Sequence, residues 1–205
     1  MPRSSLITAR CGKNDPLDIE ASIRDGCFMA LSEMVNSTNP EKVIDEMMLS
    51  GLRGRGGAGF PCGLKWSLVR QQDADTKYLI CNADEGEVGA FKDRYLIENA
   101  PYTLLEGILI GCHAIGSSTA IIYLRAEYHF LFEHLEKAIA QMRSRALLGD
   151  VEIIIIEGAG AYICGEETAL INSLQGCRGE PRHKPPFPVE QGLWGRPTVI
   201  NNVET

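Results

Sequence analysis

Two short, strongly apolar runs restrict the fold of this chain more than any other feature of its sequence. They are residues 119–125 (TAIIYLR) and 151–156 (VEIIII). Short runs rich in β-branched residues are typical of strands, and strands buried on both faces occur mainly in parallel sheets covered by helices. A third strand is expected over 77–82, and helical patterns separate the three strands, at 90–99, 101–115 and 128–144. This alternation predicts an α/β fold with a mostly parallel sheet flanked by helices.

Helices are also expected before the first strand and after the last. Asp15 is a suitable N-cap, and apolar side chains recur on one face of a helix predicted over 16–35. Asn39 begins a second predicted helix, which Gly51 ends. Two shorter helices are expected near 64–71 and over 165–175.

These patterns suggest an N-terminal helical extension and one larger domain. We expect the extension to cover residues 1–50 and the α/β domain to cover 51–205. The last thirty residues are rich in Pro and are expected to be mostly irregular.

The composition excludes several classes of protein. Of the 205 residues, 44% are apolar and 23% are charged, which excludes a disordered chain. A net charge of −7 argues against general binding to nucleic acid. The longest apolar runs are too short for a membrane span, and the N-terminus lacks a secretory apolar segment. The seven cysteines are too widely spaced for a disulfide framework or for a metal or iron–sulfur site held by this segment alone, so we expect a cytoplasmic protein.

A glycine-rich segment, residues 51–63, is the first candidate binding element. Three glycines have the spacing G-x-G-x-x-G: Gly54, Gly56 and Gly59. A helix rather than a strand precedes them, which excludes the ordinary dinucleotide fingerprint. Glycine backbone N–H groups can still surround an anion. Three nearby side chains supply positive charge: Arg53, Arg55 and Lys65. The segment therefore indicates a phosphate cradle, with a flexible surface loop as the alternative.

Polar loops follow the predicted strands 77–82 and 151–156. The first contains four polar side chains: Asn82, Asp84, Glu85 and Glu87. They suit the hydroxyl groups of a ribose or ribityl chain, or a ring N–H, and the alternatives are a solvated acidic turn and a metal site, for which nothing else nearby supplies ligands. The second is a glycine loop that opens a helix with Glu166 and Glu167 in its first turn, where simple helix capping is the alternative. Because both loops follow strand carboxyl ends, we expect them to meet at one site.

The Pro-rich segment 182–188 is the fourth candidate element. Its two adjacent prolines stiffen the chain beside Lys184 and present Phe187, whose ring suits stacking on a flat ligand. A rigid loop packed on the core is the alternative. No nucleophile with an adjacent base is evident, so we expect a cofactor rather than a side chain to carry any chemistry.

The four segments together resemble the NADH-binding FMN flavoprotein subunit of respiratory complex I. They also resemble the related diaphorase subunits of NAD-linked hydrogenases and formate dehydrogenases. The matching motifs are GLRGRGGAGFP, NADEGE, GAGAYICGEET and INNVET, and the resemblance covers about residues 12–205. It implies a Rossmann-like α/β domain that holds FMN. It also implies an FMN-dependent NADH dehydrogenase that transfers hydride from NADH to FMN and feeds electrons to iron–sulfur clusters of a larger assembly.

The resemblance assigns roles to individual positions. It implies no catalytic side chain, because the flavin carries the chemistry, with Glu166 and Glu167 near it. The implied FMN-binding residues are Gly54, Arg55, Gly56, Gly57, Lys65, Asn82, Asp84, Glu85, Gly165, Glu166, Glu167, Asn201 and Asn202. The implied NADH-binding residues are Phe60, Glu87, Lys184 and Phe187. Leu68 stands where some members carry a second aromatic wall of the adenine slot.

The resemblance also implies partners. Family members continue into a ubiquitin-like domain and a domain that binds a 4Fe–4S cluster; this segment lacks those cysteine ligands, and we expect it to be a fragment. The implied partners are a thioredoxin-like 2Fe–2S subunit and other subunits of a complex I-like, hydrogenase or formate dehydrogenase assembly. These would place a cytoplasmic protein at the inner face of the cell membrane. Two alternatives remain, a soluble hydrogenase or formate dehydrogenase diaphorase and a nucleotide-binding module without redox activity.

Overall fold

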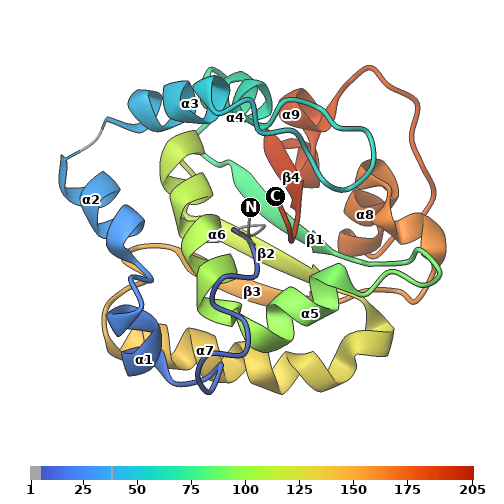
Figure 1. Cartoon of the computed structure of the whole chain (residues 1–205). Helices are drawn as coiled ribbons and strands as arrows, with labels where there is room; N and C mark the ends of the chain where they lie inside the picture. Colours follow the sequence, from blue (N-terminus) through green and yellow to red (C-terminus); the bar gives the residue numbers. More distant parts are fainter. Residues whose placement is uncertain (1–5, 38) are drawn as a thin grey trace.

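A four-stranded parallel sheet forms the centre of the molecule (Figure 1). The computed structural model describes residues 6–37 and 39–205. The strands are β1 (Tyr78–Ala83), β2 (Thr119–Leu124), β3 (Glu152–Glu157) and β4 (Thr198–Asn202), in the order β3-β2-β1-β4. All three neighbouring pairs are parallel, so the carboxyl ends of the strands share one edge of the sheet. The predicted α/β class and parallel sheet are therefore confirmed.

Helices cover both faces of the sheet (Figure 1). Along β2, Ala120, Ile122 and Leu124 point into the larger hydrophobic cluster, while Ile121 and Tyr123 point into the smaller one. The larger cluster contains side chains of α4 (Cys62–Arg70), α6 (Pro101–Ile115) and α7 (Phe132–Ser144). The smaller cluster is completed by α8 (Glu167–Leu174). This two-sided burial explains the continuous apolar sequence of β2.

The strand β3 departs from this pattern because it lies at an edge of the sheet. Ile153 is buried, but Ile154 on the smaller-cluster face is 36% exposed. Its isoleucine run therefore does not indicate complete burial, although the prediction of a strand is correct.

The single helix predicted over 16–35 is wrong. The segment forms α1 (Ile19–Arg24) and α2 (Met29–Ser37), separated by a turn in which Gly26 and Phe28 have φ angles of 85° and 69°. The ring of Phe28 is buried, with its centroid 6.1 Å from that of Tyr102. Burial of this aromatic ring offsets the cost of its left-handed backbone, which periodicity alone does not reveal.

The helix predicted after Asn39 is confirmed as α3 (Pro40–Leu49). Asn39 caps it, because its side-chain oxygen accepts a hydrogen bond from the N–H of Glu41. Val43 and Ile44 on α3 belong to the larger hydrophobic cluster. The proposed domain division at residue 50 remains a prediction.

The last thirty residues are mostly irregular, as predicted, but they also contain a strand that was not predicted. The regular elements there are α9 (Pro188–Gln191), the 3-10 turn η3 (Leu193–Gly195) and the strand β4. The strand has only five residues, and its pairing with β1 buries Val199 and Ile200. A strand this short is decided by its partner rather than by its own sequence.

The remaining elements connect the sheet to its helices. They are α5 (Lys92–Asn99) and the 3-10 turns η1 (Ala126–Leu131) and η2 (Tyr162–Gly165). The predicted helix over 128–144 therefore begins as η1 and continues as α7, and η2 precedes α8. Among the helices of residues 6–37 and 39–205, none combines the length and the apolar character needed to cross a bilayer.

Candidate functional site

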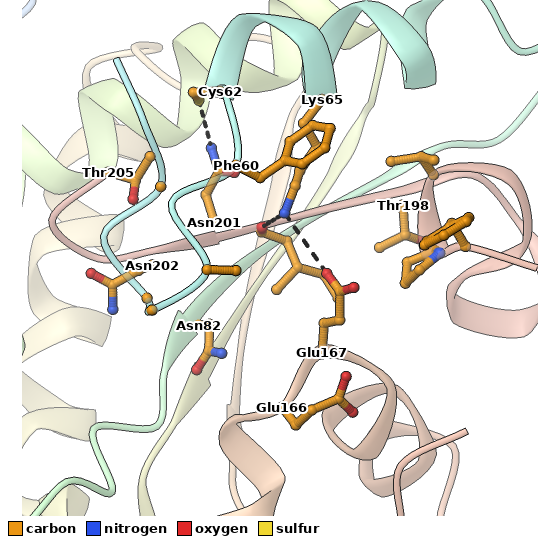
Figure 2. A pocket seen from close by; sticks show the side chains of 18 of the residues that line it. Phe60, Cys62, Lys65, Asn82, Glu166, Glu167, Thr198, Asn201, Asn202 and Thr205 are labelled. Carbon is orange, nitrogen blue, oxygen red and sulfur yellow. Dashed lines mark hydrogen bonds and ion pairs between the residues drawn. The ribbon is translucent and has the colours of Figure 1, made fainter. Parts of the chain in front are cut away.

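A cleft of about 550 Å³ opens at the carboxyl edge of the sheet, beside β4 (Figure 2). It is lined by the glycine-rich segment, by α4, by the start of α8, by the Pro-rich segment and by the end of β4. Ligand sites in open parallel sheets lie at this edge, and the volume is within the usual range for small-molecule sites.

The glycine-rich segment is held in a defined loop. The N–H of Gly54 donates to the carbonyl of Phe60, and the N–H of Cys62 donates to the carbonyl of Leu52, both at 2.9 Å. Arg53 Nε donates to the carbonyl of Gly59 at 2.7 Å. Within the described part of the chain, the N–H groups of residues 56–59 have no hydrogen-bond acceptor. This leaves adjacent donors at the wall of the cleft, as an anion cradle requires.

Lys65 projects from α4 into the cleft (Figure 2). Its Nζ donates to the carbonyl of Ile200 at 3.1 Å and lies 3.7 Å from Glu167 Oε2 and 5.9 Å from the centre of the Phe60 ring. An ammonium group has three donors, so these contacts leave capacity for a ligand.

The two glutamates at the start of α8 form ion pairs with Lys184 of the Pro-rich segment. Glu166 Oε2 accepts hydrogen bonds from the N–H groups of Thr168 and Ala169, so Glu166 is the N-cap of the helix. Lys184 Nζ donates to Glu166 Oε1 at 3.1 Å and to Glu167 Oε1 at 2.5 Å. Burial opposes ionisation of Glu166, but these donors outweigh it and lower its pKa. Glu166 is therefore both a helix cap and a wall of the cleft.

The two polar loops meet, as predicted. Asn82 Nδ2 donates to the carbonyl of Gly165 at 2.8 Å, and its Oδ1 accepts from the N–H of Asp84. A Cβ atom on Gly165 would lie 3.2 Å from the Asp84 carbonyl, so the loops are in close contact. Asp84 Oδ2 is buried without a hydrogen-bond partner. Burial raises the pKa of Asp84 to about 6, although Arg125 opposes the shift.

None of the three acidic residues of the first loop, Asp84, Glu85 and Glu87, lines the cleft. The carboxylate of Glu85 is buried, accepts from the N–H groups of Asp93 and Arg94 at the start of α5, and accepts from the Tyr128 hydroxyl. Glu87 is exposed and accepts a hydrogen bond of 2.9 Å from the Tyr162 hydroxyl.

Most of the predicted binding residues do line the cleft. They are Gly54, Gly56, Gly57, Phe60, Lys65, Asn82, Gly165, Glu166, Glu167, Lys184, Phe187, Asn201 and Asn202. The exceptions among the predicted residues are Arg55, Asp84, Glu85 and Glu87. The Arg55 side chain points to Glu204, with Nε 3.8 Å from Oε1.

Further lining residues were not predicted. They include Cys62, Gln72, Val189, Glu190, Thr198 and Thr205. Thr198 and Thr205 belong to β4 and the turn after it, so recognising β4 would have found them. Cys62 is buried, and burial raises the pKa of its thiol.

The cleft has the features that a flavin nucleotide requires. Free backbone N–H groups and Lys65 suit a phosphate, and carboxylate and amide groups suit hydroxyl and ring N–H donors. Phe60 and Phe187, 42% and 49% exposed, offer stacking surfaces at the lining. In residues 6–37 and 39–205, no group of His, Cys, Asp and Glu side chains has the arrangement of a metal site.

Comparison with known proteins gives a consistent result. The family model of the Nuo51 FMN-binding domain matches residues 47–205. A subunit of the NADH-quinone oxidoreductase of Aquifex aeolicus is 49% identical over 98% of this chain, and the chain spans 49% of that protein. NADP-reducing hydrogenase subunit HndC of Solidesulfovibrio fructosivorans is 46% identical over 98% of the chain, which spans 42% of it.

Longer hydrogenase subunits are also similar to this chain. The NAD-reducing hydrogenase HoxS subunit alpha of Cupriavidus necator is 53% identical over 81% of this chain, and the chain spans 29% of it. The crystal structure of an NAD⁺-reducing [NiFe]-hydrogenase in its H₂-reduced state superposes with a TM-score of 0.78 and 49% identity, covering 81% of this chain and 29% of that one. The chain thus spans half or less of the length of these relatives.

Proposed function

Because this chain belongs to the Nuo51 FMN-binding domain family, we propose that it binds FMN in the cleft beside β4 and passes hydride from NADH to it. The observation that carries the proposal is the convergence of all four binding segments on one cleft, where free N–H groups, Lys65 and the polar ends of two loops meet. The bound flavin supplies the two-electron acceptor.

The FMN phosphate is best matched by the glycine-rich loop. The N–H groups of residues 56–59 and the third donor of Lys65 would bind its oxygens, and a Cβ at Gly56 would approach Asn202 to 3.5 Å. The Arg55 side chain contributes long-range positive charge, since its direct partner is Glu204.

The ring end of the flavin is best matched by the two polar loops. Asn82, Gly165, Glu166 and Glu167 line the cleft there. We propose that Asp84 and Glu85 act from behind this lining, by fixing the loops rather than by touching the flavin.

NADH is proposed to enter over the flavin between Phe60 and Phe187, which offer stacking surfaces for adenine. Lys184 is held by Glu166 and Glu167 beside this entrance. Glu87 is proposed to accept a hydrogen bond from the adenosine ribose and so to favour NADH over NADPH.

The assembly around the chain is proposed by analogy. Its relatives are subunits of quinone-reducing and hydrogenase enzymes, which supports a place in a multi-subunit oxidoreductase. We propose a thioredoxin-like 2Fe–2S subunit as one partner and a cytoplasmic position, peripheral to the membrane where the assembly includes a membrane part. A hydrogenase diaphorase remains the second candidate, because HndC and HoxS alpha match this chain about as well as the Aquifex aeolicus protein does.

Titration of the purified chain with FMN tests the proposal. We expect quenching of flavin fluorescence with one FMN per chain, followed by NADH oxidation with ferricyanide as acceptor. Circular dichroism confirms folding in the same sample. A folded chain that leaves FMN fluorescence unchanged contradicts the proposal, and binding of nucleotides without flavin would favour a module without redox activity.

A further inference from the structure

A buried carboxylate lies behind the cleft, in the first turn of α5. Asp93 is 2% exposed and does not line the cleft. Its Oδ2 accepts a hydrogen bond of 2.6 Å from Asn202 Nδ2, and its Oδ1 accepts one of 2.6 Å from Lys92 Nζ. A carboxylate buried at this depth is costly unless it is paired, so both contacts constrain its position.

The partner of Asp93 is a cleft residue whose own polar atoms are all engaged. Besides the bond from Nδ2 to Asp93, Asn202 Oδ1 accepts from Lys92 Nζ at 2.7 Å and from the N–H of Glu204 at 3.0 Å. The Asn202 amide is therefore directed at α5, and its Cβ faces Gly56 of the glycine-rich loop. The orientation of this side chain is decided by residues outside the cleft.

The same cluster extends to the rim of the glycine-rich loop. Lys92 Nζ lies 3.2 Å from Glu204 Oε2, and Glu204 Oε1 lies 3.8 Å from Arg55 Nε. The N–H of Arg55 donates to Thr205 Oγ1 at 3.0 Å, which ties the loop to the turn after β4. A series of contacts thus joins α5, the end of β4 and the loop.

The start of α5 is itself fixed by the first polar loop. The N–H of Asp93 donates to Glu85 Oε1 at 3.0 Å. The backbone of Asp93 thus contacts the first polar loop, while its side chain contacts Asn202 at the end of β4.

We propose that Asp93, with Lys92, is a positioning residue for the FMN site: it holds Asn202 turned away from the cleft so that the end of β4 and the glycine-rich loop keep the spacing that the flavin phosphate needs. The proposal rests on FMN binding in the cleft. Asp93 does not touch the ligand, and its effect passes through Asn202.

A double-mutant cycle on FMN affinity tests this path. Asp93→Asn in the otherwise unchanged chain should raise the FMN dissociation constant about tenfold, the usual consequence of losing one buried charge-assisted hydrogen bond. In a chain that already carries Asn202→Ala, the same substitution should change the constant less than about twofold, because the residue through which it acts is absent. A purely structural role of Asp93 would weaken binding equally in both backgrounds.

Two further variants make the test decisive. Lys92→Met, at a side chain that is 43% exposed, removes the hydrogen bond from Lys92 Nζ to Asn202 Oδ1. Its effect on FMN affinity should also disappear in the Asn202→Ala background. This variant tests the same path if Asp93→Asn does not fold. Glu98→Gln, which breaks the exposed pair with Arg94 on the same helix, is the matched control and should leave FMN affinity unchanged.

The outcomes separate the two levels of the proposal. Failure of the unchanged chain to bind FMN overturns the proposed function. Normal binding with additive effects, or with no effect of a folded Asp93→Asn or Lys92→Met chain, overturns the positioning role alone.

Discussion

Replacing Lys65 by methionine tests whether the α4 lysine recognises the flavin phosphate. Methionine keeps the unbranched stem beside Phe60 and removes only the charge and its donors. Lys65 Nζ already donates to the carbonyl of Ile200 and faces Glu167, so one of its three donors is available for the ligand. One charge-assisted hydrogen bond is worth about 1.5–3 kcal/mol. Its loss should therefore weaken FMN binding by roughly 10- to 150-fold.

The choice of ligand makes this test specific. Fluorescence titrations of the unchanged chain and of Lys65→Met would be compared for FMN and for riboflavin, which lacks the phosphate. We expect the substitution to weaken FMN binding strongly and riboflavin binding only slightly. An equal loss for both ligands would refute the reasoning, because Lys65 would then act on the ring or on the fold of the cleft.

Three other predictions concern neighbouring parts of the site. Phe187→Ala should raise the Michaelis constant for NADH and leave bound FMN unchanged, because we propose that the ring stacks on adenine; loss of flavin with unaltered NADH affinity would assign this loop to FMN instead. Glu87→Gln should narrow the preference for NADH over NADPH several-fold, chiefly by improving NADPH, since a neutral side chain no longer repels a 2′-phosphate; an unchanged ratio of Michaelis constants would place Glu87 away from the ribose. Asp84→Asn should stabilise the ligand-free chain at pH 7.5. The pKa of Asp84 is raised to about 6 in the folded chain, so ionisation of this carboxyl lowers the free energy of unfolding as pH rises from about 4 to 6. After allowance for partial exposure the gain should be roughly 2 kcal/mol and should vanish near pH 4, and urea denaturation at the two pH values would show no such difference if the carboxylate were well solvated.

Much of the architecture follows from the sequence because the relevant signals are local. The apolar run of β2 and the cap at Asn39 each determine an element through residues next to one another in the chain. The meeting of the two polar loops also follows, since strand direction alone brings the carboxyl ends together.

The features that were missed depend on contacts distant in sequence. The break between α1 and α2 exists because Phe28 reaches Tyr102, and β4 exists because β1 offers it an edge. The same holds within the site, where Glu85 caps α5 and Arg55 turns toward Glu204. A polar motif identifies the composition of a site, but the direction of each side chain depends on partners that the motif does not contain.

The pairing of β4 with β1 has a consequence for how the protein is made. Tyr78 of β1 pairs with Thr198 of β4. One edge of β1 therefore has no partner until the residues between Tyr78 and Thr198 have been synthesised, although β1 is an interior strand of the finished sheet. An open strand edge of this kind is a template for pairing with other chains. The cleft is also incomplete at that stage, since Ile200, Asn201 and Asn202 form one of its walls. Binding of FMN in this cleft, as proposed, would therefore follow the closure of the sheet, and the edge of β1 would stay open until the cleft is complete.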